Sequence, residues 1–144
     1  MYSLATGEFQ ESHGLPKPDI NGAVTKIIVQ DEPESFMILN IRFNQGYIYH
    51  TTDGQQWQKL GGGLPTELFY AMDTDWTQHP KPLFVSTDTL VYRSDDNGQT
   101  WSNQSSGLPR RPHGADIRFV LTPKNERYLY LSTYGRSVWR TLVK

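Results

Sequence analysis

The densest group of chemically capable side chains lies in one short segment, which contains Arg110, Arg111, His113 and Asp116. Arginine guanidinium groups match carboxylates and phosphates because their N–H donors form a planar fork. The segment therefore predicts a binding site for an anionic group. The alternative is an exposed loop whose charges are simply solvated, and the residue types leave both interpretations open.

Carboxylates suited to hydrolysis are also present, although no catalytic signature connects them. A typical glycosidase needs two carboxylates that flank the bond to be broken. Glu67 and Asp88 are the candidates for this role. Asp75 and Trp76 place an acid beside a ring suited to sugar stacking, but a turn between strands explains that pair at least as well.

Metal and cofactor chemistry is not indicated. The four histidines are scattered without the close spacing of metal ligands, and the chain has no cysteine, which excludes disulfides and cysteine-based zinc sites. Glycine-rich phosphate loops and serine–histidine–aspartate signatures are also missing from the sequence. We therefore expect neither a metal nor a cofactor.

The overall charge argues against a general nucleic-acid binder. The 144 residues include 14 basic and 15 acidic side chains, a net charge of −1, whereas nucleic-acid binding favours a basic excess. No apolar run approaches the roughly 18 residues of a membrane span, and the first residues do not resemble a signal peptide. We expect one soluble domain without membrane insertion; its compartment is not indicated.

Internal repetition is the strongest organising signal in the chain. Gly-Leu-Pro occurs three times, at 14–16, 63–65 and 107–109. Each copy closes a segment that begins with a hydroxyl residue and passes through a turn to an aromatic residue. The hydroxyl residues recur roughly every 45 positions, which is a spacing typical of propellers and other repeat folds.

Each repeat predicts four short β-strands and essentially no helix. The runs are rich in β-branched and aromatic residues and are bounded by Pro, Asp, Asn and Gly. Four antiparallel strands per repeat indicate an all-β protein built from β-propeller blades. The expected blades are approximately 17–60, 66–104 and 115–141, with 2–10 as a closing strand. In the first blade, the first three strands are expected at 24–29, 36–41 and 46–51. In the second blade they are expected at 68–72, 83–87 and 89–94, and in the third at 117–121, 128–132 and 136–141.

The segment from Ser94 to Trp101 resembles the Asp-box, the Ser-x-Asp-x-Gly-x-Thr-Trp motif of bacterial neuraminidase (BNR) repeats, at every defined position. Such boxes are found in sialidases, xyloglucanase-like glycoside hydrolases and sortilin-type receptors. A second copy, from Thr51 to Trp57, is one residue shorter than the motif. The N-terminal copy, at residues 3–9, lacks both the Asp and the Trp. The resemblance implies a propeller, with the boxes on the face opposite the active site. The Arg-Ile-Pro signature of sialidases is absent from this sequence.

The box residues have a structural rationale. An Asp can accept hydrogen bonds from the backbone of its own turn, a Gly supplies positive φ, and a hydroxyl ties the turn together. The Trp buries a large ring between neighbouring sheets. We therefore assign a structural role to two sets of residues, namely Ser94, Asp96, Gly98 and Trp101, and Thr51, Asp53, Gly54 and Trp57.

Three blades are too few for a closed ring, since propellers typically have four to eight. Exposed sheet edges favour association, and two copies with twofold symmetry make a six-bladed ring. We therefore expect a homodimer in which the strand near residues 2–9 completes the last blade of the partner. A larger ring, or a chain that is a fragment of a longer propeller protein, remains an open alternative.

The loops that gather at one end of the channel are the expected functional surface. The leading hypothesis is a non-catalytic binding or scaffold module that recognises a glycan or a protein surface. A glycoside hydrolase of the sialidase or xyloglucanase type is the first alternative, and a fragment of a longer propeller is the second. The residues expected to contact the ligand are Arg42, Arg110, Arg111, His113, Asp116 and Tyr134.

Overall fold

The computed structural model describes residues 2–3, 7–9, 13–15, 22–29, 34–41, 45–60 and 62–144. Over these ranges every regular element is a β-strand, so the predicted all-β class is confirmed. In the described part of the chain, no helix has the length and apolar character that a membrane crossing requires.

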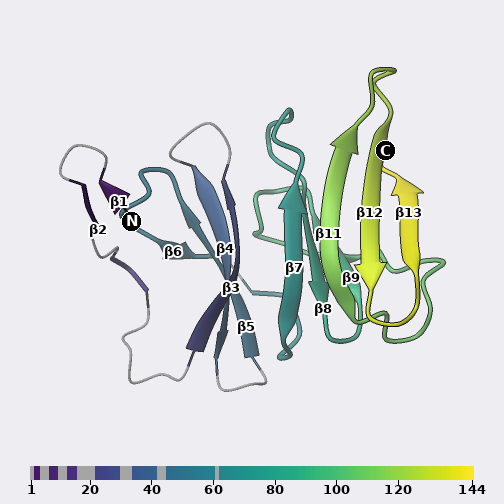
Figure 1. Cartoon of the computed structure of the whole chain (residues 1–144), viewed down its shortest axis with the longest axis horizontal. Coiled ribbons are helices and arrows are strands. Elements are labelled where there is room, and N and C mark those ends of the chain that lie inside the picture. The colour runs from purple at the N-terminus through teal and green to yellow at the C-terminus, as the bar shows by residue number, and fades with distance from the viewer. Residues whose placement is uncertain are drawn as a thin grey trace.

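Three antiparallel sheets make up most of the structure, and none of them closes into a barrel (Figure 1). The first sheet has the order β3 (Gly22–Val29), β4 (Ser35–Ile41), β5 (Gln45–Thr51) and β6 (Gln58–Lys59). The second has β7 (Phe69–Thr74), β8 (Leu83–Thr87), β9 (Val91–Ser94) and β10 (Ser102–Asn103). The third has β11 (Gly114–Leu121), β12 (Arg127–Thr133) and β13 (Val138–Leu142). A short hairpin joins β1 (Tyr2–Ser3) to β2 (Glu8–Phe9).

The first strands of the three sheets lie next to one another. β7 contacts both β3 and β11, and Figure 1 shows it standing between them. The N-terminal hairpin lies beyond the first sheet, on the side away from the second (Figure 1). The sheets therefore follow one another in chain order, and the second is enclosed by its two neighbours.

Each first strand has a β-bulge at the same place. The pairing register shifts between Val24 and Lys26, between Phe69 and Ala71, and between Gly114 and Asp116, positions roughly 45 residues apart. A bulge leaves one residue unpaired and redirects its side chain. The bulged residues are Thr25, Tyr70 and Ala115. The bulge thus recurs at the same repeat position in all three sheets, although the residue type at that position differs each time.

Two separate apolar cores hold the sheets together. The core between the first and second sheets includes Phe36, Ile38 and Met72, and the core between the second and third includes Phe84 and Ile117. β8 contributes to both cores, and all five of its residues are buried. A strand covered on both faces is typically a continuous apolar run, as the segment Leu-Phe-Val within β8 is.

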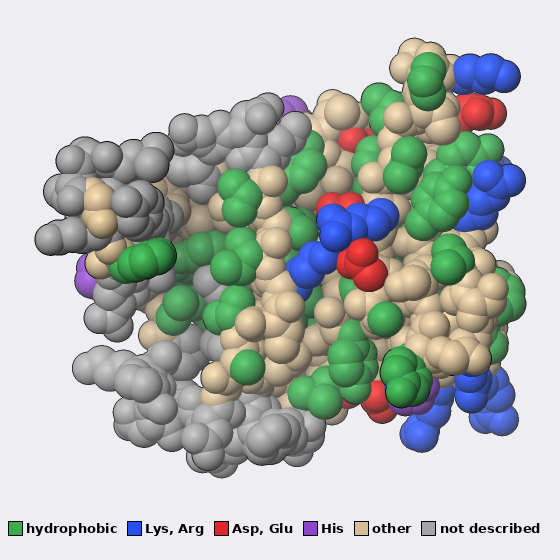
Figure 2. All heavy atoms as spheres, viewed as in Figure 1, with side chains coloured by type: hydrophobic (Ala, Val, Ile, Leu, Met, Phe, Trp, Pro, Cys, Tyr) green, Lys and Arg blue, Asp and Glu red, His purple; other side chains and the backbone are tan. Residues whose placement is uncertain are grey.

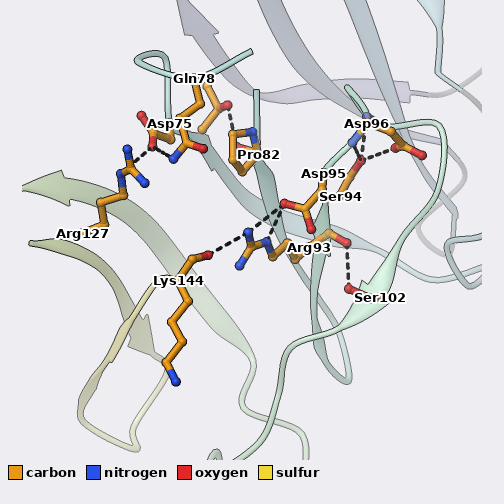
Figure 3. Close-up of polar contacts among 12 residues, drawn as sticks. Asp75, Gln78, Pro82, Arg93, Ser94, Asp95, Asp96, Ser102, Arg127 and Lys144 are labelled. Atoms are coloured by element: carbon orange, nitrogen blue, oxygen red, sulfur yellow. Dashed lines mark hydrogen bonds and ion pairs between the residues drawn. The ribbon is translucent and has the colours of Figure 1, made fainter. Parts of the chain in front are cut away.

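Ion pairs also join neighbouring sheets. Lys81, just before β8, places its Nζ 2.6 Å from Oε2 of Glu34 on the first sheet. Arg127, the first residue of β12, places its Nε 3.3 Å from Oδ2 of the buried Asp75 on the second sheet (Figure 3). In both pairs a cation at the beginning of a second strand reaches the preceding sheet. Each pair has one buried member, Lys81 or Asp75, and removing the partner would leave that charge uncompensated, which is destabilising.

The box turn between β9 and β10 is closed by its own side chains. The Ser94 hydroxyl donates to Oδ1 of Asp96 at 2.7 Å and accepts from the Gly98 N–H at 2.8 Å (Figure 3). Asp96 also accepts from the backbone N–H and the hydroxyl of Thr100, at 2.8 and 2.6 Å. These hydrogen bonds, those from Thr100 first, lower the pKa of Asp96 to about 2.

Glycine suits position 98 because its φ is +83°, a conformation that residues with a side chain rarely adopt. The half-buried Trp101 then packs against the core between the first and second sheets.

The shorter box between β5 and β6 has the same arrangement with fewer donors. Thr51 donates to Asp53 at 2.9 Å and accepts from the Gly54 N–H at 2.9 Å, while Asp53 accepts from the N–H groups of Gln55 and Gln56. These bonds, with the backbone N–H of Gln56 contributing most, lower the pKa of Asp53. The buried Trp57 packs with Tyr49 on the outer side of the first sheet.

The substitution Asp96→Asn is expected to lower the melting temperature at pH 6 and to have little effect near pH 2. The pKa of Asp96 in the folded protein, about 2, lies below its ordinary value of 3.8. The charged carboxylate therefore stabilises the fold above about pH 3.8, and this contribution disappears as the pH falls through 2. Melting temperatures of the parent and the variant, measured across this pH range by calorimetry, test the prediction.

Asp95→Asn is the matched control, since Asp95 is exposed and, among the residues that the structure describes, pairs only with Arg93. A difference between parent and Asp96→Asn that stays constant from pH 6 to pH 2 would contradict the prediction.

Candidate functional site

Several polar and aromatic side chains meet where the first strands begin. Tyr70 lies at the start of β7, Asp88 in the β8–β9 turn, His113 just before β11 and Tyr134 in the β12–β13 turn. Backbone hydrogen bonds hold these segments together, from the Asp88 N–H to the Leu68 carbonyl at 2.9 Å and from the Tyr134 N–H to the His113 carbonyl at 3.1 Å. We call Tyr70, Asp88, His113 and Tyr134 the strand-end site.

One oxygen of Asp88 is shared by two neighbours. The Tyr70 hydroxyl donates to Oδ1 at 3.2 Å, and Nδ1 of His113 lies 3.3 Å from the same atom. Within the described part of the chain, Oδ2 of Asp88 has no hydrogen-bond donor, and the Asp88 side chain is partly exposed. This oxygen is therefore free to accept a hydrogen bond from a ligand hydroxyl.

The pKa of Tyr70 is raised, because the hydroxyl is partly buried, donates a hydrogen bond to Asp88 and lies near the negative charges of Asp88 and Glu67. The phenol therefore stays protonated and acts as a hydrogen-bond donor. A tyrosine nucleophile needs activation that favours the phenolate. The environment of Tyr70 has the opposite effect.

Glu67 holds the β8–β9 turn in place. Both of its carboxylate oxygens accept from the Thr89 hydroxyl at 2.9 Å, and the Thr87 hydroxyl also donates to Oε1. The Gly46 N–H donates to the Glu67 carbonyl at 2.7 Å, which ties this residue to the first sheet. Glu67 thus positions the turn that carries Asp88.

An apolar cavity of about 330 Å³ lies between the two tyrosines. Tyr70, His113, Gly114, Ala115 and Tyr134 line it. The Tyr134 ring is 85% exposed and Tyr70 is 38% exposed, so both present ring surface to solvent. The cavity is at the lower limit of the roughly 300–1,000 Å³ typical of sites for small ligands.

The loop that carries His113 has a strained backbone. Arg111 and His113 have φ values of 50° and 44°, and the buried Pro112 lies between them. A non-glycine residue in the left-handed region costs roughly 1–2 kcal/mol, and such residues cluster at functional sites. Arg136 steadies the same loop, because its Nη1 donates to the Arg110 carbonyl at 2.7 Å.

The structure therefore gathers some of the predicted contact residues and separates others. His113 and Tyr134 meet beside Asp88, which the sequence suggested as a catalytic carboxylate, and the exposed Arg110 and Arg111 lie in the loop that borders them. Arg42 lies outside the described residues.

Asp116 lies away from the strand-end site, in a group of charges on the first strands. Its carboxylate pairs with Nζ of Lys26 at 3.0 Å and with Nε of Arg118 at 2.9 Å. Figure 2 shows positive and negative side chains gathered in the middle of this face. Asp73 belongs to the same group; burial raises its pKa, although the Phe119 N–H donates to it at 2.7 Å and Arg118 and Lys26 favour its charged form.

Tyr70 is the site residue that sequence reasoning missed. It lies within the expected strand 68–72 and was not among the expected contact residues, whereas in the structure it stands at the bulge, with its hydroxyl donating to Asp88. No sequence signal locates this bulge, because the pattern around Tyr70 is that of an ordinary strand. Among the described residues, no group of three or more His, Asp or Glu side chains is placed to hold a metal ion.

No family model matches the chain, and no curated protein or solved structure matches it either. The function must therefore be inferred from the geometry of the site.

The substitution Asp88→Asn is expected to lower the pKa of Tyr70 toward the ordinary value for tyrosine. It removes a negative charge that disfavours the phenolate, while burial of the ring is unchanged. Carbon-13 NMR of protein labelled at the tyrosine Cζ follows the titration of each ring separately. Asp95→Asn serves as the control and should leave Tyr70 unchanged. An unaltered Tyr70 titration in Asp88→Asn would show that the two side chains do not interact in solution.

Proposed function

We propose that this chain is a non-catalytic glycan-binding module, and that the strand-end site is where the saccharide binds. The observation that carries the proposal is the placement of two exposed tyrosine rings beside a carboxylate with an available oxygen. A sugar ring has an apolar C–H face that packs on an aromatic ring, and its rim of hydroxyls donates to carboxylates and accepts from phenols. Tyr134 supplies ring surface, and Asp88 supplies a hydrogen-bond acceptor. Tyr70 supplies ring surface and a phenol oxygen that can accept a hydrogen bond.

Hydrolysis is less well supported than binding. Glu67 is engaged by two threonine hydroxyls, and the raised pKa of Tyr70 disfavours nucleophilic attack by its oxygen. A glycosidase would need two carboxylates free to act on either side of the scissile bond. The alternative of a sialidase- or xyloglucanase-type hydrolase therefore lacks a supporting observation at this site.

The proposed architecture is a set of propeller blades. Three features support it, namely the succession of small antiparallel sheets, the adjacent first strands and the bulge repeated in each of them. The Asp-box turns between third and fourth strands of the first two sheets agree with the BNR repeats that the sequence resembles. In such a fold the strand-end site lies at one end of the central channel.

We further propose that two copies associate to form a six-bladed ring. Both end sheets expose apolar side chains on their outer faces, Ile27 and Val29 on β3 and Val138 and Leu142 on β13. The third sheet has three strands, and within the described residues β13 pairs only with β12. The hairpin of β1 and β2, which lies beyond the first sheet, is placed to add the missing strand to the third sheet of a second copy.

Replacing Tyr134 by Ala is expected to weaken saccharide binding at least tenfold, since an exposed ring at a binding hot spot commonly contributes more than about 1.4 kcal/mol. A glycan array identifies the ligand and titration calorimetry measures its affinity. Tyr128→Ala is the control, because Tyr128 is a comparable ring on β12 of the same sheet, away from the site. Fluorogenic glycosides run in parallel should show no turnover. If the parent hydrolyses a glycoside and Asp88→Asn or Glu67→Gln abolishes this turnover, the binding-module proposal is wrong and the hydrolase alternative is supported.

Light scattering is expected to give about twice the 16.5 kDa mass of one chain, as twofold assemblies are the commonest oligomers. Ile27→Glu places a charge on the exposed outer face of β3 and should yield monomers. Gln99→Glu, which adds the same charge at an exposed position of the box turn, should leave the dimer intact. A monomer at micromolar concentration would contradict ring closure by two copies, and a larger mass would favour a different ring or a longer parent protein.

A further inference from the structure

A second cavity, of about 550 Å³, lies on the other side of Tyr70 from the first. Tyr70 lines both cavities, which therefore adjoin at its ring. Resting on the proposed glycan-binding function, we propose that the strand-end site has two subsites separated by Tyr70. Its ligand is a saccharide of two or more units, and the unit in the second subsite is uncharged.

The repeated bulge explains why two hollows flank one ring. At the bulge position the three first strands hold Thr25, Tyr70 and Ala115, so a large side chain stands between two small ones. Two more small residues lie near them, Ala23 two positions before Thr25 and Gly114 directly before Ala115. The ring of Tyr70 consequently forms a ridge with space on both sides, and each side can receive one sugar unit.

The polar groups of the second subsite are fixed by hydrogen bonds. The side-chain amide of Asn40 donates to the Phe69 carbonyl at 2.7 Å and to the Thr25 hydroxyl at 3.1 Å, and its Oδ1 accepts from the Phe69 N–H at 3.0 Å. Asn40 is thus held rigidly between the first and second sheets. The Thr25 hydroxyl, which accepts from Asn40, keeps its own hydrogen available for an oxygen of the ligand.

The charge of the two subsites differs. Apart from the protonated Tyr70, none of the described residues that line the second cavity is ionisable. The first subsite contains Asp88 and His113. A charged sugar unit placed in the second subsite would lose hydration without gaining a partner, which is unfavourable. A neutral unit satisfies the site, because its C–H face can pack on Tyr70 and its hydroxyl can accept from Thr25.

Titration calorimetry with neutral gluco-, manno-, galacto- and xylo-oligosaccharides of one to four units tests the proposal. For the series that binds, we expect the disaccharide to bind roughly tenfold more tightly than the monosaccharide, as a second unit adds buried contacts. Ala23→Leu fills the second cavity and should reduce disaccharide affinity to that of the monosaccharide, while leaving monosaccharide affinity unchanged. Ala115→Leu is the matched variant in the first subsite and should lower the affinity for the monosaccharide and for the disaccharide.

Thr25→Val removes only the hydroxyl and is nearly isosteric, so it tests the same subsite if Ala23→Leu does not fold. Thr25→Val should lower the affinity for the disaccharide severalfold and leave the affinity for the monosaccharide unchanged. Equal affinity for one and two units in the parent, or full disaccharide binding by both second-subsite variants, would overturn the two-subsite proposal alone. No binding of any neutral oligosaccharide would also overturn the two-subsite proposal, whereas the proposed glycan function itself would be overturned by the absence of binding to every glycan on the array.

Discussion

Burial of the second sheet on both faces is the packing constraint on which the rest of the structure depends. Its strand β8 carries no exposed residue, and its neighbours β7 and β9 contribute to the same two cores. The two end sheets are held in place by packing against this one, because each contributes its larger apolar cluster to one of the two cores. The ion pairs from Lys81 to Glu34 and from Arg127 to Asp75 act across the same two interfaces. Losing the core between the second and third sheets would separate the loops that meet at the strand-end site.

The site depends on this packing through a small number of hydrogen bonds. Asn40 binds both backbone groups of Phe69, so it fixes the residue immediately before the bulge at Tyr70. Glu67 and its threonine partners hold the turn that carries Asp88. On the third sheet, close packing admits only glycine at position 114, where a Cβ would lie 2.0 Å from the Ser86 hydroxyl oxygen. Side chains of the second and third sheets therefore meet because hydrogen bonds and close packing fix the segments that carry them.

Much of the fold could be predicted from the residue pattern, because strands and turns are local. The second strand of the second sheet, expected at 83–87, is observed at Leu83–Thr87, and the third strand of the third sheet, expected at 136–141, begins two residues later at Val138. The candidate site was predictable in part. Asp88, His113 and Tyr134 meet, whereas Asp116 pairs with Lys26 from a strand far away in the sequence, and no local rule connects those two residues.

Turn chemistry is decided within a few residues, so the residue pattern alone specifies the box turns and the all-β class. Ser94 and Asp96 close their turn through hydrogen bonds that span at most four residues. The position of a bulge and the partner of an exposed ring are different, because they depend on which strands become neighbours. Tyr70 belongs to the site only because β7 is paired with a shifted register and lies between β3 and β11. That arrangement exists only in the folded chain, where burial of both faces of the second sheet selects it.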